Sequence, residues 1–192
     1  MQVDASNDYL DAALLGDLQA HFEREVFWTF GWPSNRETVV FGHWNHDFLR
    51  TRRSNQEDAE HLLFEDPGLR PLREVWQRLK ADRFPGHSLV RCYANAHTFG
   101  VEGYPHTDSR LPGNYTAILY LNPIWVPEWA GETVFFNDEG EISKAVLPKP
   151  GRLVVFDGRV LHAARGLSRI CPAMRVTLMF KTRAPGAESD SQ

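Results

Sequence analysis

Hydrophobic residues recur at helical spacing in two segments of the first half of the chain. Between residues 7 and 27 they recur mainly every four positions, with acidic residues between them: Leu10, Leu14, Leu18 and Phe22. A second stripe runs from about residue 68 to 81 and consists of Leu69, Leu72, Val75, Trp76 and Leu79. Such stripes predict amphipathic helices that bury one face. We therefore expect two helices packed against the outside of the remaining fold.

From Ser88 onward the pattern changes to short strands separated by turn residues. The expected strands cover residues 88–94, 98–101, 104–108, 114–121, 132–137, 142–147, 152–156, 161–164 and 174–182. Asp138-Glu-Gly140 has the composition of a hairpin turn. Because no helical pattern interrupts these strands, an antiparallel sandwich or barrel is indicated. The chain should be mainly β with flanking helices, as one domain over residues 1–183.

Within that domain we expect a helical N-terminal part at about 1–85 and a β core at about 88–183. Residues 184–192 are small, polar and acidic, so they predict a disordered tail. A length of 192 residues favours a single domain with a sizeable core.

Aromatic residues gather between the two helical segments, in residues 27–32 and 39–46. Three of the six tryptophans fall here, namely Trp28, Trp32 and Trp44. Two interpretations stay open: core that closes one end of the barrel, or the wall of a substrate pocket, since ligand sites are apolar clefts with a few polar groups. We expect Trp28, which is nearest the first helix, to be core and Trp44 to lie at a pocket rim.

Charge and composition exclude several classes of function. The formal net charge of −4 gives no basic field that would attract nucleic acid. No segment approaches the roughly 18 apolar residues that span a membrane, and the amino terminus lacks the pattern of a signal peptide. We therefore expect a cytoplasmic protein with neither nucleic acid nor membrane as partner. The two cysteines lack Cys-x-x-Cys spacing, so neither a zinc ribbon nor a disulfide scaffold is indicated.

His106-Thr107-Asp108 places an imidazole and a carboxylate two residues apart in an expected strand. Residues i and i+2 of a strand project from one face, roughly 7 Å apart, so the two side chains can grip one metal ion. His162, after another strand-like run, completes a set of two histidines and one carboxylate. Such a set leaves adjacent positions open, as non-haem Fe(II) requires to hold a co-substrate and O₂. His43 and His46 form a weaker alternative, because Asp47 is their only nearby carboxylate.

Arg175-Val-Thr177 begins an alternating run that places Arg175, Thr177 and Met179 on one face of a strand. A guanidinium beside a hydroxyl is suited to receive a carboxylate end-on through paired hydrogen bonds. A surface salt bridge is the alternative for any isolated arginine. Arg169 competes for the same carboxylate, although its surroundings are typical of a loop.

Taken together, these motifs resemble the Fe(II)- and 2-oxoglutarate-dependent dioxygenases, specifically the prolyl-hydroxylase-like branch. The resemblance covers about half the chain, from Ser88 to Lys181, and its pieces follow the family's order: Arg91-Cys-Tyr93, His106-Thr-Asp108, 117–122, Gly131-Glu-Thr133, 150–156, His162 and Arg175-Val-Thr177. Two features depart from it. Ala130 replaces the first of two glycines, and Arg175 lies further from His162 than in many relatives.

The resemblance implies a fold and a set of binding residues. The fold is a double-stranded β-helix, or jelly roll. His106, Asp108 and His162 would be the iron ligands, and Arg175 would hold the distal carboxylate of 2-oxoglutarate with Thr177 beside it. Tyr93 and Tyr120 match tyrosines that line the co-substrate pocket.

The resemblance also implies hydroxylation of an unactivated C–H bond with release of succinate and CO₂. The cofactors would be Fe(II), 2-oxoglutarate and O₂, with ascorbate as an accessory reductant. We expect a small-molecule substrate, such as an amino acid or a biosynthetic intermediate, and residues that flank the metal motifs as its contacts: Asn95, His97, Tyr104, Arg110, Trp44 and Trp125.

Other functions stay open. A peptidyl prolyl or other protein side-chain hydroxylase is the alternative within the class. A cupin-like metal isomerase or a non-catalytic binding module is the alternative outside it, but neither requires the dicarboxylate anchor at Arg175.

Overall fold

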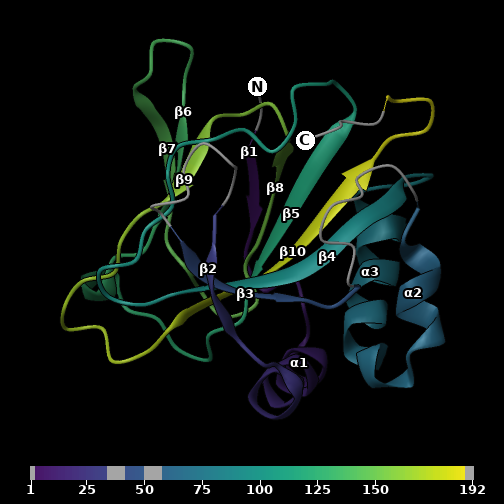
Figure 1. Ribbon diagram of the computed structural model, residues 1–192, viewed down its shortest axis with the longest axis horizontal. Helices are drawn as coiled ribbons and strands as arrows, with labels where there is room; N and C mark the ends of the chain where they lie inside the picture. The colour runs from purple at the N-terminus through teal and green to yellow at the C-terminus, as the bar shows by residue number, and fades with distance from the viewer. Residues whose placement is uncertain (1–2, 34–41, 50–57, 189–192) are drawn as a thin grey trace.

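Two antiparallel sheets face each other in the computed structural model, which describes residues 3–33, 42–49 and 58–188 (Figure 1). The large sheet has the order β1-β8-β5-β10-β4-β3-β2. Its strands are β1 (Val3–Ser6), β2 (Thr29–Trp32), β3 (His43–Asp47), β4 (Ser88–His97), β5 (Asn114–Tyr120), β8 (Leu153–Asp157) and β10 (Arg175–Arg183). The small sheet contains β7 (Ile142–Val146), β6 (Thr133–Phe136) and β9 (His162–Ala164). This is the expected jelly roll.

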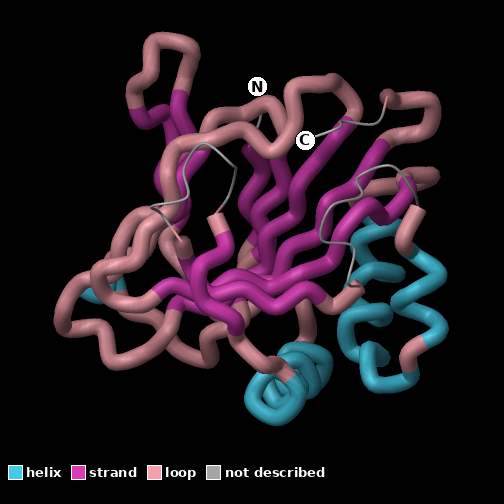
Figure 2. Tube along the Cα trace, viewed as in Figure 1, coloured by secondary structure: helices cyan, strands magenta, loops and turns pink. Residues whose placement is uncertain are grey.

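Helices α1 (Ala12–Glu25) and α3 (Arg70–Asp82) cover one face of the large sheet, with the short helix α2 (Glu60–Glu65) beside α3 (Figure 2). Asp11 caps α1, because its side chain accepts a hydrogen bond from the Leu14 amide at 2.9 Å. The expected apolar stripe of α3 is buried, with Trp76 stacked on Phe180 of β10. We call the sheet face under these helices the outer face and the face toward the small sheet the inner face.

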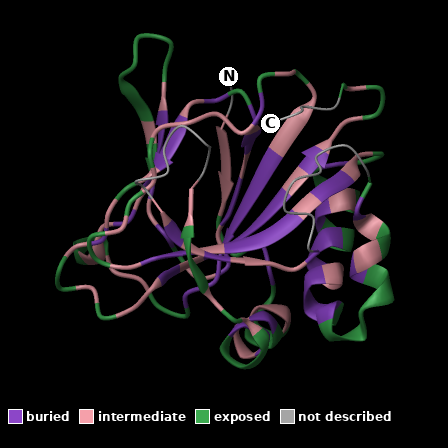
Figure 3. Cartoon of the chain, in the orientation of Figure 1, coloured by how far each residue is buried: buried purple, intermediate pink, exposed green. Residues whose placement is uncertain are grey.

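Strand alternation divides the core into two layers, and Figure 3 shows buried residues along the central strands of the large sheet. Outer-face residues of the central strands, such as Leu119, Leu178 and Phe180, pack against the helices. On the inner face Ile118 and Tyr120 pack against Phe135 of the small sheet. The inner face is the more polar of the two, because it also carries the polar groups described below.

Most of the expected elements form, but two of the expected strands do not. Residues 98–101 and 104–108 run as an extended loop, in which His106 makes only an isolated bridge to His162. Gly100 has a positive φ of 79°, and Pro105 lacks an amide donor, so continuous pairing is interrupted. The hairpin turn at 138–140 is present, with the Asn137 amide bonded to the Glu141 carbonyl.

Three strands and one helix were not expected: β1, β2, β3 and α2. Residues 39–41 of the second aromatic segment and 189–192 of the tail lie outside the described residues, whereas Ala184 donates a backbone hydrogen bond to Gly113. Among the described helices, none has the length and apolar composition that crossing a membrane requires.

Candidate metal centre

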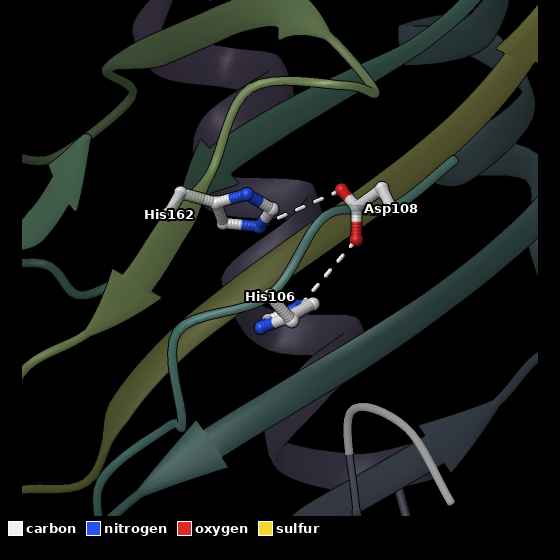
Figure 4. Close-up of side chains that lie close together, drawn as sticks. All are labelled: His106, Asp108 and His162. Carbon is white, nitrogen blue, oxygen red and sulfur yellow. Dashed lines mark ion pairs between the residues drawn. The ribbon is translucent and has the colours of Figure 1, made fainter. Parts of the chain in front are cut away.

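The side chains of His106, Asp108 and His162 converge between the two sheets (Figure 4). His106 Nε2 lies 3.5 Å from Asp108 Oδ1, and His162 Nε2 lies 3.6 Å from Asp108 Oδ2. One ligand atom from each residue lies within 4.8 Å of the others. Ligands about 2.1 Å from a metal ion lie about 3 Å apart when adjacent. The spacing and donor types therefore fit one transition-metal ion.

Both imidazoles have the tautomer that metal binding requires. His106 Nδ1 is 2.7 Å from the Tyr104 carbonyl oxygen, and His162 Nδ1 is 2.9 Å from the Val160 carbonyl oxygen. A carbonyl only accepts, so each Nδ1 carries the proton and each Nε2 presents its lone pair toward Asp108. Burial lowers the pKa of His162 to about 4, against the opposing effect of Asp108, and keeps this ring neutral at neutral pH.

Asp108 is held ionised by two neighbours. Thr116 Oγ1 donates a hydrogen bond to Asp108 Oδ2 at 2.6 Å, and Lys181 forms an ion pair with the same oxygen. Burial alone would raise the pKa of Asp108. The Lys181 ammonium is the largest opposing influence, and it holds the pKa of Asp108 well below its usual value despite the burial. The site thus presents an ionised carboxylate and two imidazoles whose Nε2 atoms lie near it, and these donors suit a cation.

Backbone pairing to residues 158–162 fixes the loop that carries His106 and Asp108. His106 and His162 exchange hydrogen bonds in both directions at 3.0 Å, and the Asp108 amide donates to the Gly158 carbonyl at 2.8 Å. His162 is in turn held by β6, opposite Phe135. The sequence predicted that the ligands come from two strands. In the structure, His106 and Asp108 come from a loop and His162 comes from the start of β9.

A second group of polar side chains surrounds Arg175 on the same inner face. Arg175 is 2% exposed, and its guanidinium lies 5.2 Å over the Tyr120 ring. Thr133 Oγ1 accepts a hydrogen bond from Arg175 Nη2 at 2.6 Å and forms another with the Tyr120 hydroxyl at 2.6 Å. The buried Arg175 Nε has no hydrogen-bond partner within the described part of the chain. A buried cation with an unused donor fits a carboxylate ligand.

The other residues of this co-substrate region lie on neighbouring positions of the same face. Thr177 is buried beside Arg175, and its hydroxyl donates to the Asn95 carbonyl at 3.3 Å. Tyr93 is 6% exposed and stands opposite Met179. Arg169 is exposed and lies 5.9 Å over the Phe99 ring. The structure therefore brings Arg175, and not Arg169, to the inner face.

The six expected substrate contacts are dispersed. Asn95 and His97 lie on the inner face opposite Thr177 and Arg175. Trp125 packs at the Arg175 end, within reach of Gly131. Tyr104 and Arg110 are exposed on the loop that carries the metal ligands.

Trp44 is the clearest departure from the expected arrangement. It stands opposite Ala96 on the outer face and packs against Phe30 at 5.0 Å, because alternation turns it away from His43 and Asn45. The structure does not bring Trp44 to the site. Trp28 packs against Phe22 in the helix-facing core.

Three residues of the site were given no role from the sequence: Thr116, Thr133 and Lys181. Lys181 was detectable, since it continues the alternation of Arg175, Thr177 and Met179 along one strand face. Thr116 and Thr133 give no comparable signal, because buried threonines are common in strands.

Comparison with known proteins agrees with this geometry. Residues 90–180 match the model of the 2OG-Fe(II) oxygenase superfamily. A search of curated proteins finds no match.

Among solved structures, similar folds include a prolyl-4-hydroxylase of Pseudomonas putida, 23% identical with a TM-score of 0.63 over 96% of this chain and 93% of that one. A Trichoplax adhaerens prolyl hydroxylase, solved with a fragment of hypoxia inducible factor, is 16% identical with a TM-score of 0.62 over 94% and 83% of the two chains. The non-haem epimerase SnoN of nogalamycin biosynthesis is 14% identical, with a TM-score of 0.60 over 98% and 78%. At these identities the likeness concerns the fold.

Proposed function

We propose that the protein, whose residues 90–180 match the model of the 2OG-Fe(II) oxygenase superfamily, hydroxylates an unactivated C–H bond of a small molecule, such as an amino acid or a biosynthetic intermediate. One observation carries the proposal. A cluster of two histidines and a carboxylate, with side chains 6–12% exposed, shares the inner face of the large sheet with a buried arginine that has an unused donor.

Each part of the interior has a role in this proposal. His106, Asp108 and His162 would hold Fe(II) through two imidazoles and one carboxylate. Arg175, with Thr133 and Tyr120, binds the distal carboxylate of 2-oxoglutarate and fixes its orientation. Bound Fe(II), 2-oxoglutarate and O₂ together supply oxidative decarboxylation to succinate and CO₂, coupled to oxidation of the substrate. Low exposure around the cluster limits the access of water to this chemistry.

A protein side-chain hydroxylase is the second candidate, because two proteins of similar fold are prolyl hydroxylases and one of them was solved with a peptide. The net charge of −4 supports the exclusion of nucleic acid as a substrate. A cytoplasmic location stays a prediction.

Anaerobic titration with Fe(II) and 2-oxoglutarate, followed by exposure to O₂ with fractionated metabolite pools, tests the proposal. We expect one equivalent of each ligand to bind and one pool to stimulate O₂-dependent succinate. A proline-rich peptide assayed in parallel tests the second candidate. Binding of both ligands without succinate from any pool or peptide would instead support a non-catalytic binding module.

A further inference from the structure

Lys181 lies on the inner face at the opposite end of β10 from Arg175. Arg175, Thr177, Met179 and Lys181 alternate along this strand, so the two cations share one face about 20 Å apart. Lys181 contacts Asp108 and donates to Thr116 Oγ1 at 2.9 Å, which places its ammonium beside the metal ligands. A co-substrate anchored at Arg175 extends from one end of this row toward the metal. Lys181 therefore lies at the end of this row that a co-substrate anchored at Arg175 would not occupy.

A second cation stands directly across from Lys181. Arg91 of β4 is its partner in the strand register, so both side chains project from the inner face. Like charges at directly opposed positions destabilise a sheet, so this arrangement calls for a compensating group. The Arg91 guanidinium lies 4.6 Å over the Tyr93 ring and 5.6 Å over the Trp32 ring. Its Nε is buried and lacks a hydrogen-bond partner among the residues that the structure describes.

Charge balance changes when the site is loaded. In the protein alone, the ion pair with Asp108 compensates Lys181, whose side chain is only 13% exposed. When a divalent cation binds Asp108, this carboxylate balances the charge of the metal and no longer that of Lys181. The two carboxylates of 2-oxoglutarate would be balanced by the metal and by Arg175. Asp47, opposite Tyr93, is the remaining inner-face acid of the described strands and offsets one positive charge at most. Among the described residues, Lys181 and Arg91 then carry more positive charge than the neighbouring acids balance, which is unfavourable at low exposure.

We propose that Lys181 and Arg91 bind a carboxylate of the substrate, with the rings of Tyr93 and Trp32 contacting the substrate's apolar part. This inference rests on the proposed function and specifies its substrate class, a small carboxylic acid. An internal residue of a polypeptide has no carboxylate at its backbone, so the same cationic pair disfavours a side chain within a peptide. Lys181 and Arg91 are thus specificity-determining residues, and neither contacts the distal carboxylate of 2-oxoglutarate.

The test uses acetate as a minimal carboxylate and acetamide as its neutral isostere. The protein is loaded anaerobically with Mn(II), which is paramagnetic, and with saturating 2-oxoglutarate, and the relaxation rate of the methyl protons of each probe is measured. We expect the protein to enhance relaxation of acetate several-fold more than relaxation of acetamide. Lys181→Met should reduce the acetate effect to the acetamide level, and Arg91→Met should reduce it in part. The exposed Lys149 supplies the control, and Lys149→Met should retain the full effect.

Two further measurements keep the outcomes distinct. Mn(II) and 2-oxoglutarate affinities are measured on every variant, and Lys181→Arg, which retains the charge, should restore the acetate effect that Lys181→Met removes. If acetate relaxes equally fast in Lys181→Met protein that is loaded with both ligands, acetate binds elsewhere and this inference is overturned. If wild-type protein binds neither Mn(II) nor 2-oxoglutarate, the proposed function itself fails.

Discussion

His106 and His162 hold each other in register, since each backbone amide donates to the carbonyl of the other at 3.0 Å. The centroids of the two imidazole rings lie 4.5 Å apart, and the His162 ring also packs against Phe156 at 4.7 Å. Because these main-chain bonds fix the spacing of the two histidines, binding of a metal ion should require little reorganisation.

Replacing His162 by Ala should abolish retention of iron and with it turnover. The backbone pairing with His106 survives the substitution, so the fold should persist while one of three ligands is lost. Iron stoichiometry after gel filtration, together with a melting curve, measures both effects. His43→Ala serves as the control, because His43 stacks on His97 away from the cluster and should leave iron binding intact. Stoichiometric iron in folded His162→Ala protein would remove the assignment.

Arg175→Leu should weaken binding of 2-oxoglutarate by about 2–5 kcal/mol, since a carboxylate would lose its charged partner in a desolvated pocket. Binding of Fe(II) should be retained, because the Arg175 guanidinium donates its hydrogen bond to Thr133 and not to one of the three metal ligands. Isothermal titration of Mn(II)-loaded protein measures the change without turnover. Arg169→Leu is the matched control at an exposed position, and a larger loss there than at Arg175 would make the loop arginine the anchor.

Gly131 sets the position of the Arg175 side chain. Its φ is 79°, and a Cβ there would lie 3.2 Å from Trp125 Cζ2 and 3.3 Å from Arg175 Cδ. Gly131→Ala should therefore cost about 1–3 kcal/mol of stability and also weaken binding of 2-oxoglutarate.

Gly140 provides the control for that variant, since it has nearly the same φ, 80°, but open space around its Cβ. Gly140→Ala should show the backbone cost alone, with unchanged affinity for 2-oxoglutarate. Equal affinities in the two variants would show that Gly131 has no influence on Arg175. Denaturant unfolding and isothermal titration supply the two readouts.

The sequence-based prediction of strands was wrong where polar functional residues interrupt the usual alternation of hydrophobic and polar positions. Strand β3 was not expected because the residues it buries on the inner face, His43 and Asn45, are polar. Residues 104–108 show the opposite error, because a strand was predicted there from the spacing of His106 and Asp108 and the structure has a loop. An isolated bridge and one amide bond from Asp108 produce the same convergence without a strand.

Features that rest on one strand were predicted more successfully than features assembled from several. The common face of Arg175 and Thr177 follows from period-two alternation alone. The contact between Thr133 and Arg175 depends on how the two sheets pack, which local sequence does not encode. The ion pair between Lys181 and Asp108 likewise joins β10 to a distant loop.

Stability should fall as the pH drops below about 6.5, in part through His97. Burial, with the Arg175 guanidinium and His43 adding to it, holds the pKa of His97 well below its usual value. Below about pH 6.5 the unfolded chain therefore takes up a proton that the folded chain does not, at a cost of up to about 1.4 kcal/mol per pH unit until the folded pKa is reached.

Replacing His97 by Gln isolates this contribution from those of other buried histidines, such as His162. Urea midpoints for wild type and His97→Gln should converge as the pH falls from 7.5 to 5. Parallel loss of stability in the two proteins would show that His97 does not titrate differently on folding.

The tryptophans of β2 and β3 should separate into a substrate contact and a packing residue. Trp32 faces Arg91 on the inner side, whereas Trp44 packs against Phe30 on the outer side. Trp32→Ala should therefore raise the substrate KM or uncouple 2-oxoglutarate consumption from hydroxylation, with melting little changed. Trp44→Ala should lower the melting temperature and leave KM and coupling as in wild type. The loss of unfolding free energy should be smaller than the roughly 3–5 kcal/mol typical of a fully buried tryptophan. Paired melting and coupling assays on the two variants decide the assignment, and a raised KM for Trp44→Ala alone would return Trp44 to the rim of the pocket.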